Sequence, residues 1–440
     1  MTRAQLRLAV AATAGAATLA ASPAFAQGAA KIDAADTAWM LGATGLVLMM
    51  TIPGLALFYA GMVRKKNVLA TMAQCMAATF LVSILWAVIG YSLTFTGDGA
   101  YIGTLDRIFL NGMTLDAISP HAKTIPESLF MIYQMTFAVI TVALVAGSVA
   151  DRMRFSAFLL FCVFWLLLVY VPIAHWVWGG GFLGSYGVVD FAGGLVVHLN
   201  AGVAGLVAAY VIGKRRGYGS ENLSPHNLTL AVIGTGLLWV GWFGFNGGSA
   251  LGANSRAAMA ITSTHLAASA GAFTWMVLEW RIRGKPSVLG MISGAVAGLG
   301  TITPASGFVM PMQAVLIGVI AGAVCFWACT WLKLKLGYDD SLDVFGVHGI
   351  GGLTGTLLAG VLAVGALSAS PELPGGVSGL LEGNPQQVLA QLYGIAVTLA
   401  WSGIMTFVVL KIVGAMVPLR VRHEDEVMGL DVTQHGEALQ

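Results

Sequence analysis

The chain has 440 residues, of which 57% are hydrophobic and only 10% are charged, and its formal net charge at pH 7 is +2. This composition lies far outside that of soluble globular domains, and apolar runs of membrane-spanning length recur from end to end. We therefore expect a polytopic membrane protein with little soluble mass, and neither an enzyme nor a nucleic-acid-binding protein.

The N-terminus has the three parts of a secretory signal. Arg3 and Arg7 precede an alanine-rich apolar stretch of roughly fifteen residues, which ends in the small-residue pattern Ala24-Phe25-Ala26. We predict that residues 1–26 form a removed signal peptide, which places the mature N-terminus outside a bacterial inner membrane. The alternative is an uncleaved first helix.

Eleven apolar segments follow. A helix of about 20 apolar residues crosses the hydrocarbon core of a bilayer. The sequence therefore predicts an all-α polytopic membrane protein with eleven transmembrane helices in a domain over 27–415. The segments lie at about 37–63, 68–96, 125–150, 155–177, 189–213, 226–248, 254–280, 287–303, 309–332, 343–367 and 388–415.

Basic residues gather at the ends of the odd-numbered segments. The clusters are Arg64 to Lys66, Arg152 with Arg154, Lys214 to Arg216, Arg281 with Arg283 and Lys285, Lys333 with Lys335, and Lys411 with Arg420 and Arg422. Because lysine and arginine are enriched in cytoplasmic loops, we expect these ends to be cytoplasmic. The N-terminus is then periplasmic, and residues 416–440 form a polar cytoplasmic tail.

Two histidines lie inside apolar segments, and their neighbours match. In each case a valine precedes the histidine and glycines follow four and seven residues later, on one helical face. The two sets are Val197, His198, Gly202 and Gly205, and Val347, His348, Gly352 and Gly355. An ionisable residue in mid-membrane is costly, so the pair predicts a functional site. The alternative is two core histidines that bond to backbone carbonyls.

A second pair of stretches also matches. Phe58-Tyr59-Ala60-Gly61 is followed by Asn67, and Phe245-Asn246-Gly247-Gly248 is followed by Asn254 at the same offset. The segments of each pair run in opposite directions, which is typical of inverted repeats. A two-fold axis in the membrane plane would bring the two histidines together, each ~12 Å from its boundary by helical rise. We predict two five-helix inverted repeats plus a C-terminal helix, at about 37–213, 226–367 and 388–415.

The remaining polar residues favour a path for a small solute. A pair of neutral imidazoles can share one hydrogen and still offer polar contacts to a passing solute. No cysteine or clustered carboxylate lies beside the histidines in sequence, so we expect no metal or cofactor. Asp190 would bind a cation or cap the following helix. His265, in the seventh segment, is expected to be a buried packing residue.

Five stretches together resemble the signatures of the ammonium transporter family (Amt/Mep/Rh). They are Phe58 to Gly61 with Lys66-Asn67, Asp190 to Gly202, Gly241 to Ser249, Asp343 to Gly349, and Gly429 to Glu437. The tryptophans and the tail indicate the bacterial Amt branch.

The resemblance implies a role for each candidate residue. It implies an outer ammonium site at Phe137, Trp178 and Ser249, which Asp190 supports structurally. It also implies a gate of Phe137 with Phe245. The pore would be lined by the twin histidines, His198 and His348, with Trp242 and Thr303. Homotrimers, and a PII-type signalling protein that binds the cytoplasmic tail, are further implications.

The expected function is transport of ammonium and methylammonium. NH4+ would be recruited at the outer aromatic site, deprotonated, and conducted as ammonia, with or without the proton, through a narrow apolar pore. Two alternatives stay open. One is a passive channel for a neutral solute such as water, urea or CO2. The other is an ammonium sensor that signals through its tail and a partner.

Overall fold

The computed structural model describes residues 30–370 and 373–439, so the signal peptide predicted at 1–26 lies outside the described residues. Residues 32–440 form one compact unit, which the following paragraphs describe. Apart from two isolated bridge contacts, the regular structure of the described residues is helical, as the sequence predicts.

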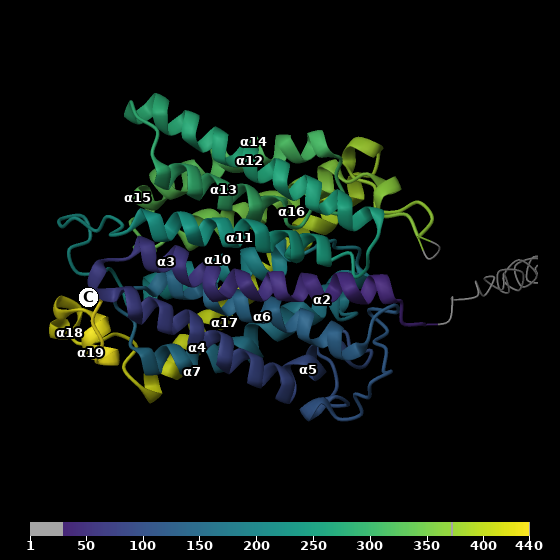
Figure 1. Cartoon of the computed structure of the whole chain (residues 1–440), viewed down its shortest axis with the longest axis horizontal. Coiled ribbons are helices and arrows are strands. Elements are labelled where there is room, and N and C mark those ends of the chain that lie inside the picture. The colour runs from purple at the N-terminus through teal and green to yellow at the C-terminus, as the bar shows by residue number, and fades with distance from the viewer. Residues whose placement is uncertain (1–29, 371–372, 440) are drawn as a thin grey trace, which may run out of the picture. The chain divides into compact units, whose positions relative to one another are not determined.

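Nine helices of the described chain are long and apolar enough to cross a membrane, and they run side by side in a bundle (Figure 1). They are Ala34–Met62 (α2, η1 and α3), Lys65–Phe95 (η2, α4, η3 and α5), Glu127–Val149 (α6), Phe155–Ser185 (α7, η5, α8 and α9), Gly194–Ile212 (η6 and α10), Leu228–Gly248 (α11), Pro311–Leu336 (α14, η7 and α15), Phe345–Leu362 (η8 and α16) and Pro385–Met416 (α17).

Two further helices fall at the remaining predicted segments. Helix α12 (Ser255–Arg283) is long but carries many serine, threonine and charged side chains, which reduce its hydropathy. Helix α13 (Val288–Ile302) is strongly apolar but has only 15 residues. His265 on α12 is exposed in the single chain, beside the ring of Trp239 at 5.4 Å. The prediction that His265 is buried is therefore wrong, because its face of α12 points away from the bundle.

Both matched histidines lie in wide, π-helical turns. His198 belongs to η6 (Gly194–Leu199) and His348 to η8 (Phe345–Gly349), and each turn continues into a regular α-helix. Such bulges are rare and are frequent at functional sites, because the extra residue changes where the neighbouring side chains point. The sequence pattern predicts the matching positions but not this local widening.

The glycines that follow the histidines explain why the residues around the two histidines match. A Cβ on Gly202 would collide with the backbone of Gly349, in the turn that carries the other histidine. Reciprocally, a Cβ on Gly352 would lie 2.6 Å from the carbonyl oxygen of Gly194, in the first turn. Small residues allow helix backbones to approach this closely. Each histidine helix therefore packs, through its own glycine, against the turn that holds the other histidine.

The C-terminal tail forms two short helices, α18 (His423–Met428) and α19 (Leu430–His435), at the end of the bundle where α4 begins (Figure 1). The Asp431 carboxylate accepts the backbone N–H of Ala70 at 2.8 Å, and the Asn67 side chain accepts that of Leu430 at 2.8 Å. Residues of the tail thus pack on the bundle, which differs from an ordinary solvated tail. We call this the tail end and the opposite end the mouth end.

Candidate functional site

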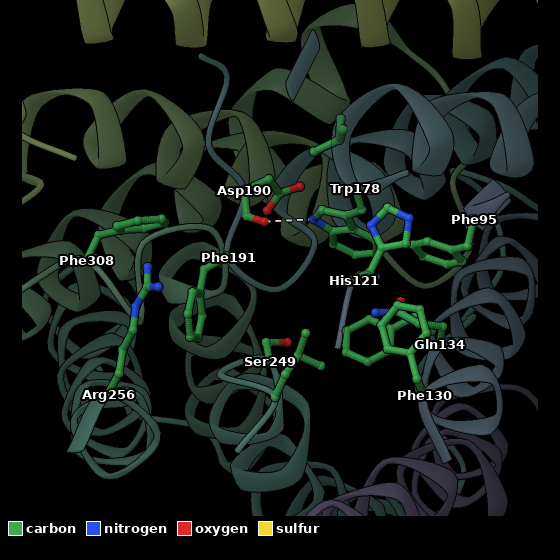
Figure 2. A pocket seen from close by; sticks show the side chains of 13 residues that line it. Phe95, His121, Phe130, Gln134, Trp178, Asp190, Phe191, Ser249, Arg256 and Phe308 are labelled. Carbon is green, nitrogen blue, oxygen red and sulfur yellow. Dashed lines mark hydrogen bonds between the residues drawn. The ribbon is translucent and has the colours of Figure 1, made fainter. Parts of the chain in front are cut away.

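A cavity of about 320 Å³ opens at the mouth end and is lined by Phe137, Trp178, Asp190 and Ser249 (Figure 2). We call it the mouth cavity. The rings of Phe137 and Trp178 meet edge to face, with centroids 5.7 Å apart. The Ser249 hydroxyl donates to the carbonyl of Phe245 at 2.8 Å and lies 3.4 Å from the Tyr133 hydroxyl. The structure thus brings together the three residues that the sequence analysis placed at the outer site.

Asp190 holds the backbone below this cavity. Its two carboxylate oxygens accept four backbone N–H groups, those of Gly193, Gly194, Leu195 and Val196, at 2.6–3.1 Å. Gly193 has a φ of +116°, a conformation that favours glycine and turns the chain so that all four groups point at the carboxylate. The Trp178 indole N–H donates to the backbone carbonyl of Asp190 at 2.8 Å. Asp190 is thus an N-terminal cap that also fixes Trp178.

Two stacked phenyl rings separate the mouth cavity from the interior. The centroids of Phe137 and Phe245 are 4.3 Å apart, with an angle of 28° between the ring planes. Both side chains are fully buried. Phe137 lines the mouth cavity, whereas Phe245 lines the next cavity inward. The stacked pair therefore lies between the two cavities.

His198 and His348 meet directly below the phenyl pair. Their Nδ1 atoms are 3.2 Å apart, a hydrogen-bond distance at which one nitrogen donates and the other accepts. The two rings are nearly parallel, with 15° between their planes, and Trp242 stacks on His198 at 5.4 Å. The Trp242 indole donates to the Thr303 hydroxyl at 2.9 Å, and that contact fixes the ring. Within the described chain, Nε2 of His198 has no hydrogen-bond partner.

The interior path is narrow, and its first cavity is almost entirely apolar. Two small cavities of about 10 and 20 Å³ follow one another, and Phe58, Val296 and His348 line both. A space of about 10–15 Å³ holds one water molecule, so each of these cavities has room for about one molecule of that size. Of the residues around the first cavity, His198, His348 and Trp242 carry polar side-chain atoms. The others are Met50, Leu55, Phe58, Ile140, Leu144, Val197, Leu238, Phe245 and Val296. The second cavity also has the side chains of Tyr59, Ser293 and Asp343 in its lining.

Two charged or titratable residues at the mouth were missed as site residues by the sequence analysis. His121 comes from the loop before α6 and Arg256 from the start of α12, and both line the mouth cavity. The Arg256 guanidinium lies between the rings of Phe191 and Phe308, 4.8 and 4.6 Å from their centroids (Figure 2). The only signal in the sequence was that each is a titratable residue in a region expected at the outer face.

The sequence as a whole matches the model of the Ammonium Transporter Family over residues 38–439. The chain belongs to this family. It is 50% identical over 402 residues to an ammonium transporter of Bacillus subtilis, a match that covers 91% of this chain and 97% of the relative. It is 44% identical to ammonium transporter Amt1 of Archaeoglobus fulgidus, with 91% and 98% covered.

Solved structures show the same fold as this member of the ammonium transporter family. The crystal structure of Saccharomyces cerevisiae Mep2 matches with a TM-score of 0.83 and 39% identity, over 89% of this chain and 88% of Mep2. A chain described as a sensor Amt protein matches with a TM-score of 0.82 and 28% identity, over 91% and 98%. The family prediction and the all-α multi-pass fold are therefore confirmed.

Proposed function

We propose that this family member transports ammonium, and methylammonium, across a bacterial inner membrane. The observation that carries the proposal is the order of the parts along one line. The aromatic mouth cavity, the stacked phenyl pair, the histidine pair and the narrow interior cavities follow one another from the mouth end inward. The positive-inside pattern supports a periplasmic mouth end and a cytoplasmic tail.

The mouth cavity would recruit the ammonium cation. Phe137 and Trp178 offer ring faces and edges within one small space, and cation–π attraction to such rings grows to about 2 kcal/mol as the cation loses water. The Ser249 oxygen would accept one N–H of the cation. Asp190, whose oxygens are occupied by backbone N–H groups, would act by orienting Trp178 and the backbone rather than by direct contact.

The interior would conduct ammonia after deprotonation. An apolar path imposes a large dehydration cost on any cation, and K+ cannot avoid it. Ammonium can shed a proton, and NH3 then needs only one or two polar contacts, which the pair of His198 and His348 would provide below the gate of Phe137 and Phe245. Trp242, held by Thr303, completes that wall. Urea is disfavoured because it is too large for cavities of this volume.

Assembly and regulation are inferred from the family resemblance. We infer a homotrimer with one pore in each subunit and a PII-type protein that contacts the cytoplasmic tail. Sensing is the second candidate function, because a sensor Amt protein shares the fold and because the tail packs against the bundle rather than extending from it. The two roles differ in turnover: a transporter moves many ammonium ions, whereas a pure sensor moves few or none.

Ammonium pulses on purified protein in proteoliposomes test the proposal. We expect ammonium to cause a rapid change in internal pH, with a transient current if the proton crosses with ammonia, and an equal pulse of K+ to cause neither. Empty liposomes give the background. A protein that binds ammonium but produces no pH change and no current above that background would identify a sensor instead.

A further inference from the structure

The mouth cavity has a neighbour on the same end of the bundle. This second cavity, of about 450 Å³, is lined by Asp98, Asp106, Arg107 and Glu127, and we call it the side cavity. Phe95 and His121 line both cavities. The His121 side chain therefore forms part of the wall between the space where ammonium would bind and a space rich in carboxylates.

Packing fixes the His121 ring in this wall. Its centroid lies 5.4 Å from that of Phe95 and 6.1 Å from that of Phe130, whose plane is nearly parallel to it. The backbone N–H of His121 donates to the Ser119 hydroxyl at 3.3 Å, which ties the loop to this position. Figure 2 shows the imidazole among the side chains that line the mouth cavity.

The other titratable residues around the mouth cavity are poorly suited to take a proton. Both oxygens of Asp190 already accept two backbone N–H groups each, so the four lone-pair positions of its carboxylate are occupied. Arg256 is a permanent cation and has no acceptor atom. Among the side chains that line this cavity, His121 is thus the one with a basic nitrogen at neutral pH.

His121 is neutral when ammonium arrives. Burial lowers the pKa of its imidazole below the ordinary value, a hydrogen bond with the backbone of Phe95 offsets part of this effect, and the neighbouring His175 adds to it. The ionisable groups that border the two cavities around it are Asp98, Asp106, Arg107, Glu127, Asp190 and Arg256. Arg107 pairs with Glu127 at 2.9 Å, so the negative charge left in the side cavity belongs to the two aspartates.

We propose that His121 accepts the proton that ammonium releases in the mouth cavity and passes it to water in the side cavity. An N–H bond of NH4+ breaks and its electron pair stays on nitrogen as the lone pair of NH3. The free imidazole nitrogen forms the new N–H bond. The imidazolium then gives its proton to a water molecule in the side cavity, where Asp98 and Asp106 stabilise the positive charge.

The arrangement keeps the charge in the mouth constant during the transfer, because one cation replaces another. Ammonia is a stronger base than imidazole, so the first step is unfavourable by itself. Two events draw it forward: ammonia leaves through the phenyl pair, and the proton leaves by a different route through the side cavity. Separate exits would prevent the two from recombining in the mouth.

The inference rests on the proposed transport of ammonium, and the experiment separates the two. Ammonium-driven pH changes are measured in proteoliposomes with the wild type, with His121→Gln and His121→Asn, and with the control His226→Gln. His226 is a half-buried histidine near the tail end, where its ring contacts the carbonyl of Val63. If the wild type shows no transport, the proposed function fails before any variant is compared.

We expect both His121 variants to lose about 100-fold in maximal rate, the lower limit of general acid–base effects, with little change in KM. Imidazole added outside should restore part of the rate in a third variant, His121→Gly, since the mouth cavity can admit it, but should not affect His226→Gln. In the wild type, the maximal rate should fall as the external pH drops through the pKa of His121, because imidazolium cannot accept a proton.

Several results would overturn the assignment. Variants that keep the wild-type maximal rate, or that change only KM, would show that His121 is merely part of the wall. A wild-type rate that does not fall at any external pH down to the lowest at which the protein stays folded would do the same and needs no variant to fold. Loss of rate without any rescue by imidazole, in variants with the wild-type melting temperature, would indicate a structural effect.

Discussion

The mouth cavity and the pore of this protein differ in size and in the chemistry of their walls. The mouth cavity has a volume of about 320 Å³ and contains an imidazole, a guanidinium and a carboxylate in its walls. The first pore cavity has about 10 Å³, and its polar atoms come from the histidine pair and one indole. The mouth is suited to hold a charged, partly hydrated ion, whereas the pore is suited to a neutral molecule the size of water. In the proposed function, the phenyl pair marks the boundary before which ammonium loses its proton.

This comparison makes the histidine pair the most sensitive part of the pore. Replacing both His198 and His348 by leucine should reduce ammonia conduction by at least about 100-fold. The solute then loses the buried polar contact that each histidine would provide. The melting temperature should stay close to that of the wild type, because leucine suits apolar walls. Ammonium-driven pH changes in proteoliposomes measure the rate.

The matched control is His265→Leu, at the exposed histidine of α12. It should transport normally. A double variant that keeps both the wild-type rate and its discrimination against K+ would show that the pair is structural, and the distinction between mouth and pore would then rest on size alone.

Trp178→Leu should affect the mouth and leave the pore unchanged. Loss of one ring from the cation site removes about 1–2 kcal/mol of attraction for a partly dehydrated cation. We therefore expect KM for ammonium to rise about 10-fold with a smaller change in maximal rate. Initial rates over a range of ammonium concentrations separate the two. Trp280→Leu, at an exposed tryptophan, serves as the control. A fall in maximal rate at constant KM would place Trp178 in the pore step instead.

The smallest expected effect comes from Thr303→Val, which keeps the shape of the side chain but removes the hydroxyl that holds Trp242. Loss of one such bond costs about 1 kcal/mol, so the maximal rate should fall about 3- to 5-fold with KM unchanged. Thr262→Val, at an exposed threonine of helix α12, is the control. A rise in KM would mean that the indole contributes to cation binding, and the boundary between mouth and pore would lie deeper than the phenyl pair.

The same contrast explains how far the sequence could predict this site. The spans follow from long apolar runs, and the histidine pair follows from two matched frames whose helices run in opposite directions. Both signals recur along the sequence, so they can be recognised without knowledge of the fold. The packing of Gly202 on Gly349, and of Gly352 on the first turn, gives the physical reason why the frames had to match.

The mouth was less predictable because loops and helix ends build much of it. His121 and Arg256 belong to no repeating pattern, and only the folded chain places them around one cavity. Phe137, Trp178 and Ser249 were assigned from the family resemblance rather than from spacing. The failed prediction for His265 has a similar cause, since a single polar residue in an apolar helix does not reveal which face it occupies.

The reciprocal glycine contacts also say something about mutational tolerance. A backbone that touches another backbone leaves no rotamer to adjust and no side chain to shorten, so an added methyl group at Gly202 or Gly352 must move a whole helix. A scan of all substitutions should therefore find these positions as restrictive as the histidines themselves, although they never touch the solute. In this protein main-chain geometry sets the width of the path. Two glycines, which have no side chain, therefore help to determine which solute can pass.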